Sequence, residues 1–258
     1  MQPPGCRGSD SSTPDDSGTG ITVAGNKVEH GSVEVINNSD SDGGVYVKTT
    51  RGDATGINFH STVDNSALKN SSLISVWSES GVARGLDSES LYSSDIVNTN
   101  TGTIMAVSGK KEATGLYTEN NYNKITINNE GKIGAASQGG AARGIHVKLK
   151  KDYQNNTIGI DNSGEIQVGS SDTDSAGIAV TDLTSGTREA SIINNGKISL
   201  LGGEAGKAGN RAGIQFVQNN AASSLGTTLS FTNKENGEVD ADENSSGILL
   251  SASDSSTT

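Results

Sequence analysis

Arg51, Gly52 and Asp53 form an Arg-Gly-Asp tripeptide, which is the most suggestive short motif of the chain. It falls in a predicted turn between strand-like segments at 45–47 and 57–59. An exposed turn of this kind presents a cation and a carboxylate together, as host matrix proteins do to integrins. Because Gly and Asp are abundant in this chain, a chance occurrence is the competing interpretation.

Acidic pairs with the spacing Asp-x-Asp are the next candidates. Two of them lie at comparable places, before a Gly-Ile segment: Asp172 with Asp174, and Asp240 with Asp242. Paired carboxylates in loops can bind calcium through oxygen, so these are weak candidates for metal ligands. Solvated acidic turns are the favoured interpretation. The three histidines lack metal-ligand spacing, and we expect no cofactor.

The one basic cluster combines Lys148, Lys150 and Lys151 with the neighbouring Tyr153. It is a candidate patch for an anionic glycan or a receptor, and a solvated loop edge is the alternative. Exposed aromatic side chains are frequent interface anchors. Other candidates for that role are Tyr46, Tyr117 and Trp77.

Several function classes fit the sequence poorly. The net charge of −11 argues against nucleic-acid binding, because an acidic surface repels a phosphate backbone. The single cysteine, Cys6, cannot form a disulfide within the chain. No nucleophile elbow or protease signature is present. We therefore expect a protein that acts by binding and not an enzyme.

Two phrases alternate along the chain and must position these residues. The first, Ile-x-Asn-x-Gly-x-Ile, occurs as INNEGKI at 127, IDNSGEI at 160 and IINNGKI at 192, and loosely as NTNTGTI at 98 and KENGEV at 234. The second is a small residue, Gly and an aliphatic residue, as in ATGLYT at 113 and ARGIHV at 142. Its glycines recur every 29 to 36 residues, at Gly56, Gly85, Gly115, Gly144, Gly177, Gly213 and Gly247. A repeat of this length indicates a stacked architecture.

The central Asn and the following Gly of the first phrase are predicted to form a tight corner. Asn tolerates the left-handed backbone conformation, its amide can bond the Asn of the next coil, and Gly is permissive. These corner residues are Asn100, Gly102, Asn129, Gly131, Asn162, Gly164, Asn194 and Gly196.

The repeat predicts an all-β fold, a parallel β-helix of about seven to eight coils with three short strands in each. Apolar residues make up only 31% of the chain, which suits a thin core repeated many times. We expect a disordered leader at 1–20, the β-helix at 21–250 and a polar tail at 251–258.

The two phrases resemble those of Gram-negative autotransporter passenger domains, in particular pertactin-like adhesins and self-associating surface autotransporters. The resemblance covers residues 21–250 and implies that the parallel β-helix is right-handed. It also implies export through the outer membrane to the cell surface or beyond. It implies a fragment of a passenger whose own translocator barrel lies outside this chain.

The resemblance implies a virulence-related adhesin that contacts a host cell-surface receptor, a matrix protein or a glycan. Three alternatives remain: a released passenger that binds a host receptor and signals, self-association between cells, and a β-helix enzyme that processes polysaccharides. The last would require acidic and basic groups on one face at successive coils.

Overall fold

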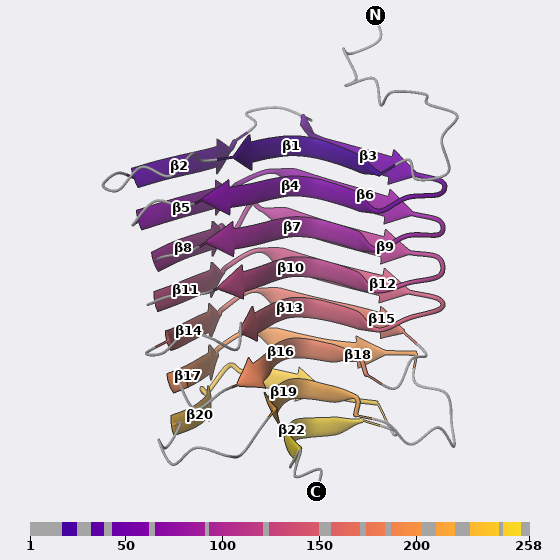
Figure 1. Cartoon of the computed structure of the whole chain (residues 1–258). Coiled ribbons are helices and arrows are strands. Elements are labelled where there is room, and N and C mark those ends of the chain that lie inside the picture. Colours follow the sequence, from indigo (N-terminus) through magenta and orange to yellow (C-terminus); the bar gives the residue numbers. More distant parts are fainter. Residues whose placement is uncertain are drawn as a thin grey trace, which may run out of the picture.

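The chain forms a parallel β-helix, as the repeat predicts, in the computed structural model (Figure 1). The structure describes residues 17–24, 32–38, 43–61, 65–90, 93–120, 124–149, 156–170, 174–183, 187–202, 210–219, 228–242 and 245–253. All regular elements in these ranges are strands, and each pairs in parallel with the strand one coil away. The coils therefore stack along one axis, and the N- and C-terminal strands lie at opposite ends.

Three sheets form the walls of the stack. Sheet A has eight strands: β1 (Gly18–Ala24), β4 (Ala54–Ser61), β7 (Ala83–Ser90), β10 (Ala113–Asn120), β13 (Ala142–Leu149), β16 (Ala176–Leu183), β19 (Ala212–Asn219) and β22 (Ser246–Ser253). Sheet B has seven: β2 (Ser32–Asn37), β5 (Asn65–Asn70), β8 (Ser93–Asn98), β11 (Lys124–Asn129), β14 (Asn156–Asn162), β17 (Thr187–Asn194) and β20 (Thr228–Asn233). Sheet C has seven: β3 (Gly44–Thr49), β6 (Leu73–Ser78), β9 (Thr103–Ser108), β12 (Lys132–Ser137), β15 (Glu165–Ser170), β18 (Lys197–Leu201) and β21 (Glu238–Asp240).

The core consists of columns of aliphatic side chains that run along the stack. Because alternate residues of a strand face opposite sides, the same position of each coil points inward. In sheet A this column includes Leu116, Ile145 and Ile178, all fully buried. Sheets B and C contribute equivalent columns, for example through Ile127 and Ile133. A small apolar content is sufficient because each coil needs only a few such residues.

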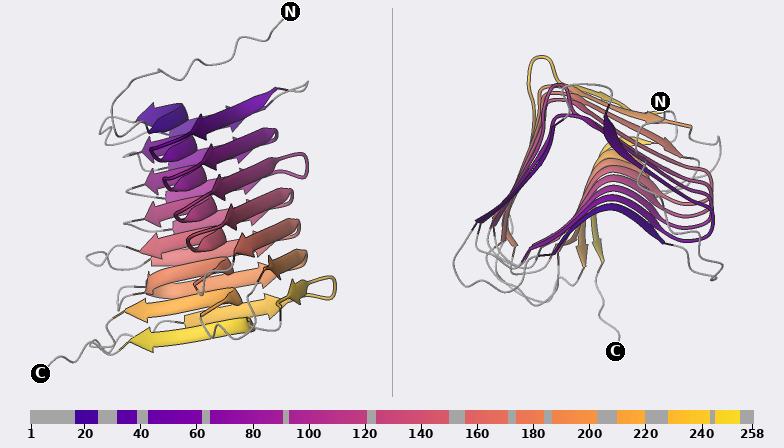
Figure 2. Two further views of the ribbon diagram at one scale, coloured as in Figure 1. Left: turned by 90° about the vertical axis from the view of Figure 1, so that its right-hand side faces the viewer. Right: turned by 90° about the horizontal axis from the view of Figure 1, so that it is seen from above.

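The recurring glycines of sheet A are explained by close contact with sheet C. A Cβ atom on Gly144 would collide with Cγ2 of Ile166 in sheet C and with the carbonyl oxygen of Gly177 in the next coil. Gly85, Gly115, Gly177 and Gly213 meet the same kind of obstacle. Seen along the stack, the strands of sheet A are curved (Figure 2). The glycines thus let sheet A approach sheet C.

An asparagine ladder forms the corner between sheets B and C. Each side-chain amide donates a hydrogen bond from Nδ2 to Oδ1 of the asparagine in the next coil, at 2.7–2.8 Å. This confirms the predicted stacking of Asn129, Asn162 and Asn194. The ladder runs through Asn37, Asn70, Asn98, Asn129, Asn162, Asn194 and Asn233.

Two details of the predicted corner are wrong. Asn98 occupies the ladder and not Asn100, because this turn is two residues longer and leaves Asn100 exposed. The left-handed backbone conformation is not what selects the corner residues, since only Asp182 and Gly202 have positive φ among the described residues. Gly131, Gly164 and Gly196 are required instead because a Cβ atom would strike the backbone of the preceding coil.

The ends of the β-helix extend slightly beyond the predicted limits. β1 begins at Gly18 rather than at residue 21, and β22 ends at Ser253 rather than at residue 250. Most of the predicted leader and of the polar tail, residues 1–16 and 254–258, lies outside the described residues.

Candidate functional site

The outer face of sheet A carries a compact group of charged and aromatic side chains, which we call the sheet A cluster. Its members lie on β7, β10, β13 and the turn before β10, so they come from three consecutive coils. Strand register aligns Asp87, Tyr117 and His146 in one outward column. The cluster comprises Arg84, Asp87, Glu112, Tyr117, Arg143 and His146.

Tyr117 lies at the centre of the cluster and contacts both neighbouring coils. The guanidinium carbon of Arg84 is 4.0 Å from the centroid of its ring, a cation–π contact. On the other side, the His146 ring meets Tyr117 edge-on, with centroids 5.3 Å apart. Arg84 also donates to Asp87, with Nη1 2.7 Å from Oδ2. These contacts cover Tyr117, which is only 6% exposed although it faces outward.

Glu112 joins the other side of the cluster. Its Oε2 lies 3.0 Å from Nη1 of Arg143 in the next coil, and its Oε1 accepts a hydrogen bond from Thr114 at 3.0 Å. Nδ1 of His146 is 3.8 Å from Oε1, which is too far for a hydrogen bond. The carboxylate is therefore held by Arg143 and Thr114, with His146 beside it.

These surroundings determine the charges in the cluster. Burial would raise the pKa of Glu112, but the charge of Arg143 and the hydrogen bond from Thr114 outweigh it and hold the pKa at about 2. Burial, reinforced by the charge of Glu119, raises the pKa of the Tyr117 hydroxyl. At neutral pH Glu112 is thus ionised and Tyr117 is protonated.

The imidazole of His146 is nearly as enclosed as the ring of Tyr117. Its Nε2 lies 2.9 Å from Oγ1 of Thr181 on β16, whereas its Nδ1 has no hydrogen-bond partner among the described residues. Burial lowers the pKa of this imidazole more strongly than Glu112 raises it, so the ring is neutral at pH 7. The Nε atoms of Arg84 and Arg143 also have no hydrogen-bond partner within the described ranges.

Charged side chains at the margin of the cluster are more accessible. Glu119 accepts a hydrogen bond from the Tyr117 hydroxyl at 3.4 Å and pairs with Lys148 at 3.8 Å. His60 and Glu89 form a similar pair, with Nδ1 and Oε2 3.1 Å apart. An incoming ligand would therefore meet a surface of mixed charge.

The predicted Arg-Gly-Asp turn lies between β3 and β4, and contacts between coils hold it in place. Gly52 is buried, and its carbonyl oxygen accepts hydrogen bonds from Thr49 and Ser78, both at 2.8 Å. Oδ1 of Asp53 accepts from the backbone amide of Val82 in the next coil at 2.8 Å. Only Arg51 is exposed without such a contact, so the carboxylate has a structural role.

The structure describes three of the four residues in the predicted acidic pairs, and it gives them different surroundings. Asp174 accepts a hydrogen bond from Asn210 at 3.3 Å, and Asp240 lies exposed on β21. Asp242 instead pairs with the buried guanidinium of Arg211 at 2.7 Å. Asp172 lies outside the described residues. No group of three or more His, Cys, Asp or Glu in the described ranges could hold a metal ion.

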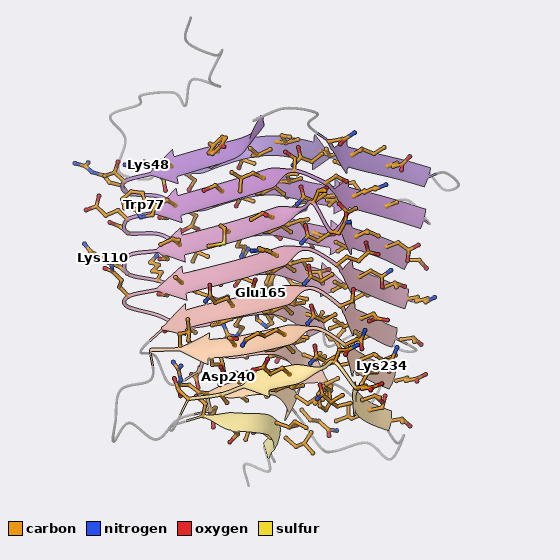
Figure 3. The ribbon with its side chains drawn as sticks, turned by 180° about the vertical axis from the view of Figure 1, so that it is seen from behind. Lys48, Trp77, Lys110, Glu165, Lys234 and Asp240 are labelled. Atoms are coloured by element: carbon orange, nitrogen blue, oxygen red, sulfur yellow. The ribbon has the colours of Figure 1, made fainter. Side chains whose placement is uncertain are left out.

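Of the predicted basic cluster, only Lys148 is described, on the outer face of β13. Lys150, Lys151 and Tyr153 lie outside the described residues. Two of the aromatic candidates lie on the outer face of sheet C: Tyr46 is 63% exposed, and Trp77 is half-buried. Nζ of Lys48 is 4.7 Å from the Trp77 ring centroid, and both side chains lie near the same edge in Figure 3.

Sequence reasoning missed the sheet A cluster, although its signal lies in the repeat. The variable position after Gly-Leu or Gly-Ile is Asp87, Tyr117 or His146 in consecutive phrases, and Arg84 and Arg143 precede the glycines of two of them. Aligning the phrases would have placed these residues side by side. Their burial, however, depends on the neighbouring side chains that cover them.

Comparisons with known proteins found no relative of this chain. No protein-family model, curated protein or solved structure matches the chain. Within the described residues, no helix is long and apolar enough to cross a membrane.

Proposed function

We propose that this chain is a secreted or surface-displayed binding protein of the autotransporter passenger type, an adhesin that contacts a host cell-surface receptor, matrix protein or glycan. The observation that supports the proposal best is the sheet A cluster. Charged and aromatic side chains converge there from consecutive coils, with mixed charge at the margin. The resemblance of the two repeat phrases to passenger domains supplies the proposed location.

A stiff scaffold favours binding through such a surface. Side chains already fixed by contacts between coils lose little conformational freedom when a partner binds, which lowers the cost of association. Arg and Tyr are the residue types most often dominant in interfaces. Arg84 exposes 32% of its side chain and Glu112 31%, so both can meet a partner.

The test is saturable binding of the labelled chain to cultured host cells. We expect Arg84→Ala combined with Arg143→Ala to reduce binding at least tenfold. The matched control is Lys69→Ala combined with Lys124→Ala, which also removes two cations, but from exposed positions on sheet B. Circular dichroism and thermal unfolding must show that each variant folds. Equal binding by both double variants would contradict a contact at the sheet A cluster.

The Arg-Gly-Asp turn can be tested in the same assay. Because Asp53 is engaged by Val82, we expect Arg51→Ala to leave binding largely unchanged. Loss of binding in that variant, with normal folding, would move the contact from sheet A to this turn.

One observation favours a second function, a polysaccharide-processing enzyme. Acidic and basic groups do occur on one face at successive coils, in Glu112, Arg143 and His146. An ionised Glu112 cannot act as a general acid at neutral pH, and His146 is only 7% exposed. The test is incubation with acidic polysaccharides. Formation of shorter or unsaturated products, abolished by His146→Gln, would favour the enzyme.

A further inference from the structure

The outer face of sheet C carries an apolar surface that is separate from the sheet A cluster. Register aligns β3, β6 and β9, and alternate residues of each strand face away from the core. Their inward neighbours, such as Ile74 and Ile104, are fully buried. Apolar patches on an outer surface mark interaction sites. We call this outward group the sheet C platform, and it comprises Tyr46, Lys48, Leu73, Trp77, Met105 and Val107.

Small residues keep the platform flat. Met105 lies across Gly134 of the next coil, since a Cβ atom added to Gly134 would meet the sulfur of Met105. Ser75 separates Tyr46 from Met105 in the same outward column. The strands lie about 4.8 Å apart, so large and small side chains alternate along the stack. Such a surface suits an extended partner that lies along several coils.

The charge of this part of sheet C differs from that of the rest of the sheet. None of the outward positions on β3, β6, β9 and β12 is acidic, and two of them are lysines. Farther along the stack, Glu165 and Asp240 face outward. Figure 3 shows Lys48, Trp77 and Lys110 following one another along one edge, with Glu165 and Asp240 nearer the other end of the stack.

Turns between sheets C and A border the platform and add basic side chains. Arg51 and Lys110 are exposed in two of these turns. Glu79 is exposed in the turn between them, whereas Asp53 and Glu112 are engaged by neighbouring coils. The platform therefore combines aromatic rings with cations, in a chain whose net charge is −11.

We propose that the sheet C platform binds an acidic polysaccharide, one that carries carboxylate or sulfate groups. The C–H bonds on the face of a sugar ring are slightly positive and pack against the negative face of an aromatic ring. Tyr46 and Trp77 supply such rings. Nζ of Lys48 is 4.7 Å from the Trp77 ring centroid, so a cation and a ring lie within reach of one sugar unit. Lys48 and Lys110 pair with the anionic groups.

The open shape of the platform favours a polymer over a single sugar, because several successive units must each contribute a weak contact. This site is distinct from the sheet A cluster, so the two can be tested separately.

Fluorescence titration tests the proposal, because Trp77 is the only tryptophan of the chain and its emission reports on this site. Heparin is the sulfated probe, polygalacturonate the carboxylated probe and dextran the neutral one. We expect a saturable change in emission with at least one acidic probe, weakened by added salt, and none with dextran. No change with either acidic probe would overturn the proposal. So would a change with vesicles of anionic phospholipid alone, since that result indicates a membrane surface.

The cations of the site are tested by Lys48→Ala combined with Lys110→Ala, which should weaken binding of the acidic probe by about tenfold. The matched control, Lys69→Ala combined with Lys124→Ala, removes two exposed lysines from sheet B and should bind like the unaltered chain. Equal affinity of the two double variants would contradict a contact at the platform. Circular dichroism must show that each variant retains its strands.

Arg84→Ala combined with Arg143→Ala separates this site from the sheet A cluster. That variant should bind the acidic probe as tightly as the unaltered chain, whatever its effect on binding to host cells. Loss of polysaccharide binding in this variant, with its strands retained, would place the polysaccharide on sheet A and overturn the proposal.

Discussion

Nδ2 of Asn98 donates a hydrogen bond to Oδ1 of Asn129 in the next coil, at 2.8 Å, while Asn70 donates to Asn98 at the same distance. Asn98 is 1% exposed. It is thus an internal member of a chain of buried amides, and each neighbour depends on it for one hydrogen bond.

Replacement of Asn98 by Ala should therefore be costly. The change leaves Oδ1 of Asn129 and Nδ2 of Asn70 unsatisfied, and each buried unsatisfied group costs about 1–3 kcal/mol. We expect the free energy of unfolding in urea to fall by about 2–4 kcal/mol. Asn100→Ala, only two residues away in the exposed turn, should change it by less than about 0.5 kcal/mol. Similar losses in both variants would show that the ladder does not stabilise the fold.

The glycine column of sheet A makes a second prediction. In Gly144→Ala the new methyl group meets Ile166 and the backbone of Gly177, so the sheets must separate, at a cost of about 1–3 kcal/mol. Gly247→Ala is the matched control, because Gly247 occupies the equivalent place in the last coil and has nothing within 4 Å of its added Cβ. Thermal unfolding should show a lower midpoint for Gly144→Ala alone. A lower midpoint in both variants would attribute the effect to the strand backbone and not to packing.

Much of the fold could be predicted from the sequence because each coil repeats the same requirement. Each position of the first phrase has one structural role: Ile127 and Ile133 are buried, and Asn129 and Gly131 form the corner. The same roles recur in the next coil, so the spacing alone indicated parallel stacking. Asn100 was misassigned because the longer turn shifts the phrase by two residues, and only the hydrogen bonds reveal which asparagine is stacked.

The candidate site was harder to predict from the sequence than the fold. His146 faces outward from β13, yet it is only 7% exposed, because Tyr117 on β10 and Thr181 on β16 contact its ring. The tripeptide at Arg51 suggested a free loop, whereas hydrogen bonds from Thr49 and Ser78 fix it in the stack. Such contacts depend on three-dimensional neighbours and not on local residue type.

The pair of Arg211 and Asp242 supports a third prediction. The Arg211 side chain is 2% exposed, and it donates to Asp242 and to the carbonyl oxygens of Ser170 and Leu201. Asp242→Ala should leave a buried positive charge without its carboxylate, which costs about 3–5 kcal/mol. Urea unfolding should detect this loss. Asp240→Ala, an exposed position two residues earlier, is the control and should be nearly neutral.

The same region was a candidate calcium site in the sequence, and the structure leads to a different expectation. Because Asp242 is engaged by Arg211 and Ser245, adding calcium should not change the midpoint of thermal unfolding. An increase that depends on calcium concentration and disappears in Asp242→Ala would contradict this assignment. Such an increase is expected for any ion that binds the folded state alone.

Glu112 makes the stability of the protein depend on pH in the acidic range. Its pKa falls from 4.5 to about 2 in the folded state, so the unfolded chain binds a proton more readily. The resulting stabilisation is present above pH 4.5 and is lost as the pH falls toward 2. A shift of this size corresponds to about 3 kcal/mol.

Glu112→Gln removes the titrating group while keeping its shape. We expect the variant to be less stable than the unaltered chain at pH 7, because Arg143 loses its partner, and the difference to shrink as the pH is lowered to 2. Urea unfolding at a series of pH values measures both curves, and subtracting one from the other cancels the contributions of the remaining carboxylates. Glu130→Gln, at an exposed corner, is the control. A difference that stays constant between pH 7 and pH 2 would mean that the Glu112 carboxylate is not held by the charges around it.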